Sequence, residues 1–198
     1  MYWEASYRSG EFRRAWDSAY ASTELVGYKG SLESAEKLVS LDVGCGSGED
    51  AIFMSIGVGK SYGIDISPTA VSIATRKSSL LHSKVEFVVG DLFSMPFPAF
   101  SIDMVTDRGC LHNIDYSKWD KYESEVSRVL RPGGILFLRG ARRETKYDEN
   151  FSFIEPETVK SVFIPQRWRI KGSYPFTMFS GASDGILLSN LFILQKAK

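Results

Sequence analysis

The stretch Val39-Ser40-Leu41-Asp42-Val43-Gly44-Cys45-Gly46-Ser47-Gly48 decides the fold of this chain. A short apolar run ends in three glycines at alternate positions, and Glu49-Asp50-Ala51-Ile52-Phe53-Met54 then opens a helix with acids in its first turn. Glycine tolerates a positive φ and has no Cβ, so the backbone can come close to a ligand. A strand, a tight glycine turn and a helix together favour binding of a nucleotide-like ligand.

The spacing of the glycines argues against a dinucleotide. A dinucleotide turn has the pattern G-x-G-x-x-G, in which a helix N-terminus meets a pyrophosphate. Here the pattern is G-x-G-x-G, and Glu49 stands where the third glycine would fall. A carboxylate at that place would repel a pyrophosphate. We therefore expect a ligand that carries no phosphate at this turn.

A second apolar run, 61–66, contains an acid about 20 residues beyond the turn, the distance at which a strand-end carboxylate can accept hydrogen bonds from a ribose. That acid is Asp65. A ligand with a ribose but no phosphate fits both observations. S-adenosylmethionine, an adenosine joined through a sulfonium to an amino-acid tail, is such a ligand.

Residues 41–48, with Gly63-Ile64-Asp65-Ile66-Ser67, resemble the first two motifs of class I S-adenosylmethionine-dependent methyltransferases. The resemblance implies that the turn faces the methionine tail and that Asp65 holds the ribose hydroxyls. It also implies that Asp91, at the end of a third strand, accepts a hydrogen bond from the adenine amino group. The alternatives are a ligand-free glycine turn and, for Asp91, a simple turn cap. The expected cofactor-binding residues are Asp42, Gly44, Cys45, Gly46, Gly48, Asp65, Ile66, Asp91, Leu92, Trp3 and Trp16.

Composition limits the class of protein. The 198 residues suffice for one α/β domain with a sizeable core. With 24 basic and 24 acidic residues the net charge is zero, so nucleic acid is not the expected partner. We find no apolar stretch of the ~18 residues that a membrane helix needs and no signal-peptide pattern. Two cysteines, Cys45 and Cys110, predict neither a disulfide framework nor a metal cluster, and a cytoplasmic location is expected.

Strands alternate with helices along most of the chain, which predicts a parallel sheet with right-handed crossovers. The expected strands are 39–43, 61–66, 84–89, 102–106 and 135–138, with helices at 67–82 and 117–130 between them. After a helix at 156–163, two strand-like runs, 168–179 and 186–195, are too close for a helical crossover and predict an antiparallel hairpin. With the family resemblance, this gives an α/β, Rossmann-like, mostly parallel seven-stranded sheet with helices on both faces and a C-terminal antiparallel hairpin.

We expect one methyltransferase domain, 1–198, in three parts: an N-terminal helical lid (1–38), a cofactor-binding core (39–140) and a C-terminal helix and hairpin (141–198). In a helix predicted at 11–20, Phe12, Trp16 and Tyr20 would share one face. This face either packs on the core or covers the cofactor, because aromatic rings attract a sulfonium cation. Trp3 and Trp16 are the candidates for that cover.

The stretch Asp107-Arg108-Gly109-Cys110-Leu111-His112 follows the fourth strand, where class I methyltransferases place residues that face the methyl acceptor. It resembles thiopurine S-methyltransferase and its small-molecule relatives, and it lacks the Asn-Pro-Pro-Tyr run of enzymes that methylate base nitrogens. Arg108 can hold an anionic acceptor or the cofactor carboxylate, or else form a salt bridge with Asp107 or Asp103. His112 and Asp107 are candidate general bases, whereas Cys110 is expected to be a small buried filler.

Four basic residues surround the end of the fifth strand. A solvated basic loop is the favoured interpretation, and attraction of an acidic acceptor is the alternative. These residues are Arg139, Arg142, Arg143 and Lys146.

The predicted function is methyl transfer from S-adenosylmethionine to a small-molecule acceptor by direct in-line displacement, without a metal. The alternatives are an RNA or protein methyltransferase on the same fold and a cofactor-binding protein without catalysis, since a fold does not prove an activity. We expect a monomer or a weak homodimer.

Overall fold

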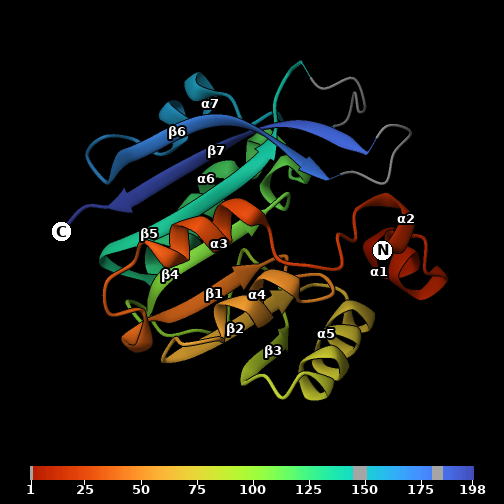
Figure 1. The fold of residues 1–198 in the computed structure, drawn as a ribbon. Coiled ribbons are helices and arrows are strands. Elements are labelled where there is room, and N and C mark those ends of the chain that lie inside the picture. The colour runs from red at the N-terminus through yellow and green to blue at the C-terminus, as the bar shows by residue number, and fades with distance from the viewer. Residues whose placement is uncertain (1, 145–150, 180–184) are drawn as a thin grey trace.

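A computed structural model describes residues 2–144, 151–179 and 185–198 (Figure 1). Its centre is a seven-stranded sheet with the order β3-β2-β1-β4-β5-β7-β6. The first five strands are parallel, and β7 is antiparallel to both β5 and β6. The predicted fold class is confirmed. The strands are β1 Val39–Val43, β2 Lys60–Asp65, β3 Val85–Val89, β4 Ile102–Arg108, β5 Leu130–Ala141, β6 Trp168–Phe179 and β7 Ile186–Lys196.

Helices cover both faces of the sheet (Figure 1). The longest is α5, which begins as predicted: Ser67 Oγ accepts the Ala70 N–H at 3.1 Å and Pro68 is the first helical residue. The α-helices are α1 Tyr2–Ser9, α2 Phe12–Ala15, α3 Thr23–Gly30, α4 Glu49–Met54, α5 Pro68–Leu80, α6 Trp119–Val129 and α7 Pro156–Val162, and the 3-10 helices are η1 Ala35–Lys37, η2 Leu111–Asn113 and η3 Tyr116–Lys118.

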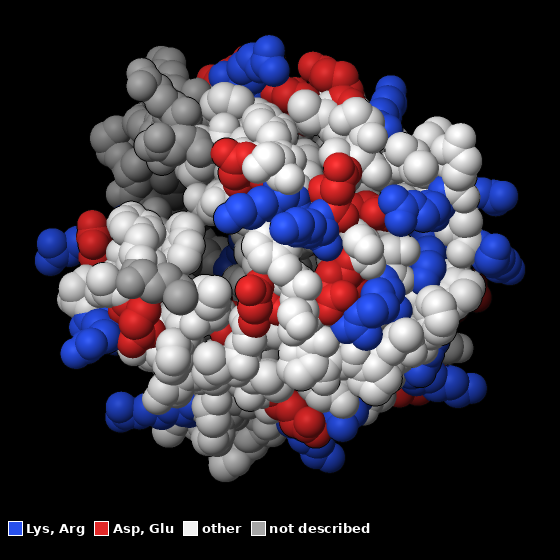
Figure 2. All heavy atoms as spheres, turned by 180° about the vertical axis from the view of Figure 1, so that it is seen from behind, with Lys and Arg blue, Asp and Glu red and all other residues white. Residues whose placement is uncertain are grey.

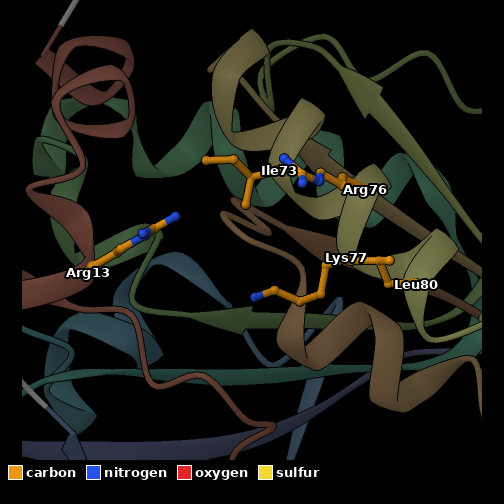
Figure 3. Close-up of a pocket in the computed structure, with 5 residues that line it drawn as sticks. All are labelled: Arg13, Ile73, Arg76, Lys77 and Leu80. Atoms are coloured by element: carbon orange, nitrogen blue, oxygen red, sulfur yellow. The ribbon is translucent and has the colours of Figure 1, made fainter.

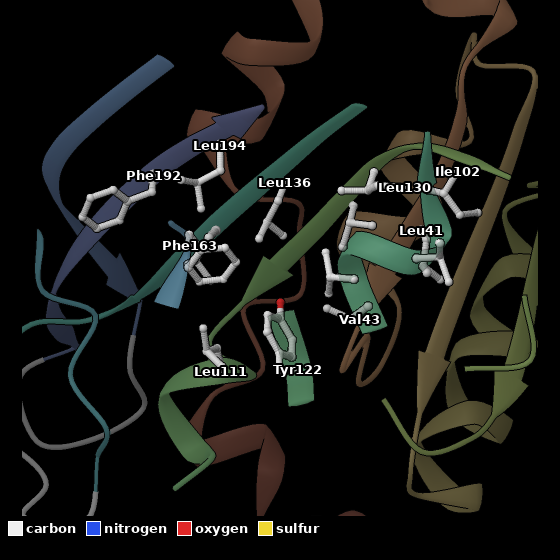
Figure 4. Packing of buried hydrophobic residues seen from close by; sticks show 14 of the residues in the cluster. Leu41, Val43, Ile102, Leu111, Tyr122, Leu130, Leu136, Phe163, Phe192 and Leu194 are labelled. Carbon is white, nitrogen blue, oxygen red and sulfur yellow. The ribbon is translucent and has the colours of Figure 1, made fainter. Parts of the chain in front are cut away.

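Two apolar clusters hold the helices on the sheet. On one face, α6 buries Trp119, Tyr122, Val126 and Val129 against β1, β4 and β5 (Figure 4). These positions recur at helical spacing, which places all four on one side of α6. On the other face, α3 and α4 pack against β4, β5 and β7 in a smaller cluster of Leu25, Met54, Met104, Phe137 and Leu191. The sheet is therefore buried on both sides, as a parallel sheet requires.

The predicted helix over 11–20 is wrong in its length. α2 ends at Ala15, and Tyr20 is exposed rather than aligned with Phe12. Beyond the helix, Asp17 Oδ1 accepts the Ala19 N–H at 3.3 Å and Ser18 Oγ donates to the Tyr20 carbonyl at 2.8 Å. Short polar side chains compete with helical hydrogen bonds in this way, which explains the early end.

The face opposite to that of Figure 1 carries lysines and arginines interspersed with acids (Figure 2). This mixture agrees with the zero net charge of the sequence. No helix in the described ranges combines the length and apolar character needed to span a membrane.

Substitution of Gly48 tests whether the turn is as closely packed as the structure shows. Its φ is +91°, and an added Cβ would lie 2.8 Å from the Phe87 ring and 2.9 Å from the Ala74 Cβ. We expect Gly48→Ala to lower the free energy of unfolding by about 3 kcal/mol, because backbone strain and overpacking add together. Urea denaturation measures the loss.

The matched control is Gly57→Ala. Gly57 has a φ of +70° but nothing within 4 Å of its added Cβ, so only the backbone cost of about 1 kcal/mol applies. Equal losses in the two variants would contradict the close packing around Gly48.

Candidate functional site

The glycine turn joins β1 to α4 at the carboxyl edge of the sheet. Gly44, Gly46 and Gly48 all have positive φ. A Cβ added to Gly44 would lie 2.6 Å from Cys110 Sγ, and one added to Gly46 would lie 2.5 Å from the Tyr7 hydroxyl. The turn therefore needs glycine both for its backbone angles and for the segments that press against it.

The peptide N–H groups of the turn are largely used within the protein. Cys45 N–H donates to the Ile64 carbonyl at 3.0 Å, Gly46 N–H to Asp65 Oδ2 at 2.9 Å, and Gly48 N–H to the Cys45 carbonyl at 2.9 Å. Glu49 is buried beside them, where it accepts the Ser47 hydroxyl at 2.9 Å and pairs with Lys77. Such a turn is a poor cradle for a pyrophosphate, since three of its donors are already occupied and an acid stands next to them.

Asp65 connects the ends of two strands. Its Oδ2 accepts the Gly46 N–H and its Oδ1 accepts the Ser67 N–H, both at 2.9 Å. Burial raises the pKa of this carboxyl, while these backbone N–H bonds oppose the rise. Each carboxylate oxygen has a second lone pair, so Asp65 can still accept hydroxyl groups from a ligand.

The remaining predicted cofactor residues spread around the same edge. Asp91 is exposed after β3, and its Oδ1 caps the Phe93 N–H at 2.9 Å, which is the turn-cap alternative. Leu92 beside it is half-buried, and Ile66 after β2 is 38% exposed. Asp42 differs from these, because it lies buried within β1. Burial raises the pKa of its carboxyl well above the usual value, and the negative charge of nearby Asp50 raises it further.

The N-terminal segment lies over the turn. Glu4 of α1 accepts Ser67 Oγ at 2.6 Å, and Thr69 N–H and Oγ1 at 3.1 and 2.6 Å, at the start of α5. Trp16 Nε1 donates to the Tyr7 hydroxyl at 3.1 Å, and the Trp3 and Trp16 rings lie 5.3 Å apart edge to face. Tyr7 thus lies against Gly46, Trp16 contacts Tyr7, and Trp3 contacts Trp16.

Sequence reasoning missed Glu4 and Tyr7 as contacts of this region. Tyr7 belongs to an aromatic-rich N-terminus, but nothing in its spacing singles it out.

Arg108 extends from the end of β4 and pairs with neither predicted acid. Asp103 is paired with Arg131 at 2.7 Å instead. The partner of Arg108 is Asp50, whose Oδ1 lies 3.5 Å from its Nη1, and the same Nη1 donates to the Tyr20 carbonyl at 3.3 Å. The predicted salt bridge to Asp107 or Asp103 is therefore wrong.

Arg139 was expected in a solvated loop, and that prediction is wrong as well. The side chain is fully buried, with Nη1 2.8 Å from Asp50 Oδ2. It also donates to the hydroxyls of Ser22 and Thr106. Asp50 accepts the Ser22 N–H at 3.0 Å too, so one carboxylate binds two arginines and a peptide group.

The other basic residues of that group differ from Arg139. Arg142 is half-buried and pairs with Glu144 at 3.4 Å, Arg143 is exposed, and Lys146 lies outside the described residues. The only signal for Asp50 in the sequence was an acid in the first turn of a helix.

Asp107 is fully buried and holds the loop after β4. It accepts the Cys110 N–H at 2.8 Å, the Leu111 N–H at 3.1 Å and the Tyr122 hydroxyl at 2.8 Å. Burial raises its pKa to about 6, although these donors oppose the rise. With its oxygens bound in the core, Asp107 supports the neighbouring Arg108 and is badly placed to take a proton from an acceptor.

His112 is buried, and its Nδ1 accepts the Ala141 N–H at 2.8 Å. A neutral ring with this bond carries its proton on Nε2. Cys110 packs against Gly44 and is half-buried, so it fills space there without being enclosed in the core, and desolvation raises the pKa of its thiol well above the usual value. The described residues contain no group of acids, cysteines and histidines that could hold a metal ion.

Comparison with known proteins finds a similar domain in the central part of the chain. Residues 41–138, just under half of the chain, match the family model "Methyltransferase domain". This match agrees with the class predicted from the glycine turn and Asp65, the S-adenosylmethionine-dependent methyltransferases.

Two curated relatives match over a similar stretch. A fatty-acid O-methyltransferase of Mycolicibacterium smegmatis is 33% identical over 110 residues, which are 54% of this chain and 38% of the relative. A demethylmenaquinone methyltransferase of Bacillus licheniformis is 34% identical over 118 residues, 58% of this chain and 47% of the relative. The aligned region thus spans less than half of the length of either relative.

Among solved structures, an S-adenosylmethionine-dependent methyltransferase of Methanosarcina mazei has a TM-score of 0.74 at 21% identity. The match covers 90% of this chain and 99% of that one. At this identity the likeness concerns the fold.

The paired charges around Asp50 give a prediction about stability. Asp50→Asn keeps an oxygen for the Ser22 N–H but leaves Arg139 buried without its close counter-charge. We expect a loss of about 3–5 kcal/mol in the free energy of unfolding. The control, Glu86→Gln, breaks the exposed pair with Lys60 and should cost at most about 1 kcal/mol. An Asp50→Asn variant as stable as the control would contradict the role of the pair.

The raised pKa of Asp107 predicts that the free energy of unfolding depends on pH. Its raised pKa means that the folded state binds the proton more tightly than the unfolded chain does, so its contribution to stability falls as pH rises from about 4 to about 6. Asp107→Asn removes this dependence. The difference in unfolding free energy, wild type minus variant, should fall by on the order of 3 kcal/mol over this interval and then stay level. Urea denaturation across the interval checks this, and a difference that is flat from the start would refute it.

Proposed function

We propose that this chain transfers a methyl group from S-adenosylmethionine to a small-molecule acceptor by direct in-line displacement. The observation that carries the proposal is Asp65 bound to the Gly46 N–H at the carboxyl edge of a sheet with the order 3-2-1-4-5-7-6. In an open parallel sheet this edge is where ligands bind. The match of residues 41–138 to a methyltransferase domain supports the same conclusion.

The residues present suit this cofactor. The turn is lined by backbone, has three of its N–H donors occupied and is flanked by the buried acids Glu49 and Asp65. These features favour a ligand that carries positive charge and a ribose. We propose that the turn from Gly44 to Gly48, including Cys45 and Gly46, lies along the methionine tail and that Asp65 accepts the ribose hydroxyls.

If the turn and Asp65 hold the methionine tail and the ribose, the other predicted residues surround the rest of the cofactor. Ile66, Asp91 and Leu92 would surround the adenine, and Trp3 and Trp16 would cover the ligand. Asp42, buried beneath the turn, would support it rather than touch the cofactor. The division into a lid, a core and a C-terminal helix and hairpin stays part of the proposal, with the Glu4 and Tyr7 contacts as support for the lid.

The protein's contribution to the reaction is alignment. S-adenosylmethionine supplies a methyl group already activated on a sulfonium, and the acceptor nucleophile must approach it from the side opposite the sulfur. Holding two reactants in this geometry contributes roughly 7–11 kcal/mol. We propose that Arg108 orients an anionic group of the acceptor or of the cofactor, and that Asp107 and His112 position the Arg108 loop, Asp107 through the Cys110 N–H and His112 through the Ala141 N–H.

We propose a small-molecule acceptor without restricting it to the acceptors of the thiopurine S-methyltransferase branch. The Asp107-Arg108-Gly109 run and the N-terminal aromatic residues favour that branch. The names of the curated relatives, a fatty-acid O-methyltransferase and a demethylmenaquinone methyltransferase, favour small apolar acceptors of another kind. A product assay over thiols, carboxylic acids, amines and quinols separates these acceptors, and methylation of RNA or protein alone would overturn the small-molecule proposal.

Asp65 provides the sharpest test of the cofactor site. Hydrogen bonds to a charged group contribute about 1.5–3 kcal/mol each, so loss of two in Asp65→Ala should weaken S-adenosylmethionine binding by at least about 100-fold. Isothermal titration measures the affinity, and circular dichroism checks the fold. If the alanine variant unfolds, the affinity is measured instead with Asp65→Asn, which keeps an oxygen for the Gly46 N–H. Asp120→Ala on α6 is the control, and an unchanged affinity in a folded Asp65 variant would refute the ribose assignment.

A further inference from the structure

A groove lies between Arg13 of α2 and the outer side of α5 (Figure 3). Its volume is about 360 Å³, and its lining consists of Arg13 from α2 and Ile73, Arg76, Lys77 and Leu80 from α5. Figure 3 shows the Arg13 side chain reaching from one wall toward Ile73 and Lys77 on the other. Nothing in the proposed methyl transfer uses these residues.

The groove combines positively charged side chains with apolar ones. Lys77 is engaged by Glu49, but no carboxylate pairs with Arg13 or Arg76 within the described ranges. Ile73 is half-buried and Leu80 is 72% exposed, and the aliphatic stems of the arginines add further apolar surface. In a chain with zero net charge, this is a local surplus of cations next to exposed hydrocarbon.

We propose that this groove binds a small anionic amphiphile, a molecule with an acidic headgroup and an aliphatic chain. The headgroup lies between Arg13 and Arg76, whose forked donors suit a carboxylate or a phosphate. The chain covers Ile73 and Leu80, which removes their side chains from water. Binding itself does not depend on the proposed methyl transfer.

The position of the groove couples it to the glycine turn. Phe12, next to Arg13, packs with Tyr7 against Ala70 of α5. On the opposite wall, Lys77 pairs with Glu49, which accepts the Ser47 hydroxyl in the turn. A ligand that bridges α2 and α5 therefore holds the N-terminal segment in its docked position over Gly46. This second step rests on the proposed function, since it assumes that the cofactor binds beneath the docked segment.

The direct test titrates decanoate, kept below its micellar concentration, into the cofactor-free protein by isothermal titration. We expect saturable binding of one molecule, roughly tenfold weaker binding in the Arg13→Ala/Arg76→Ala double variant, and unchanged binding in the control Arg14→Ala, which removes an exposed arginine of the same helix outside the groove. Decanol, which lacks the charge, should bind more weakly than decanoate. Equal affinity of the double variant and the wild type would overturn the proposal, because decanoate would then occupy another site such as the acceptor site.

A second arm identifies the source of the headgroup. Vesicles of anionic phospholipid are compared with neutral vesicles in a sedimentation assay. Binding of anionic vesicles without binding of decanoate would overturn the proposal in favour of a membrane surface. For the coupling, saturating decanoate should tighten S-adenosylmethionine binding in the wild type and leave it unchanged in the double variant. If decanoate binds as predicted but S-adenosylmethionine does not bind at all, the groove proposal stands and the proposed function fails.

Discussion

The hydrogen bond from the Gly46 N–H to the Asp65 carboxylate is the contact on which the rest of the site depends. It joins the end of β1 to the end of β2, and it is formed only because the turn takes positive φ at three glycines. The same turn brings the Tyr7 hydroxyl and Cys110 so close to Gly46 and Gly44 that no Cβ would fit. The N-terminal segment and the loop after β4 are therefore placed by the shape of one short turn.

A second constraint lies directly behind the turn. Asp50, in the first turn of α4, receives Arg139 from β5, Arg108 from the end of β4 and the Ser22 N–H from the N-terminal segment. Burying these charges is tolerated because each has an oppositely charged partner. The network fixes Arg108 at the end of β4, and it connects β4 and β5 to α4 and to the segment before α3.

The sequence predicted the parts of the molecule that depend on local pattern. The glycine turn, the start of α5 at Ser67 and Pro68, and the hairpin of β6 and β7 follow from spacing, capping residues and connection length, all of which are visible in short windows. The seven-stranded, mostly parallel sheet with a C-terminal hairpin was predicted with the help of the family resemblance and is confirmed.

The partners of charged side chains could not be predicted in the same way. Arg139 and Asp50 are far apart in the sequence, and only the packing of β5 beside β4 and α4 brings them together. The contact of Glu4, in α1, with the start of α5 likewise joins residues that are far apart in the sequence. The early end of α2 is decided by competing side-chain hydrogen bonds. For this reason the residues that hold the cofactor site in place were harder to foresee than the turn itself.

The central claim is that this edge of the sheet accepts a sulfonium nucleoside and excludes a diphosphate. Equilibrium titration of the purified protein with S-adenosylmethionine and, separately, with NADH tests it most directly. The account predicts saturable binding of S-adenosylmethionine and no binding of NADH at the same concentrations. Firm binding of NADH with no binding of S-adenosylmethionine would contradict it.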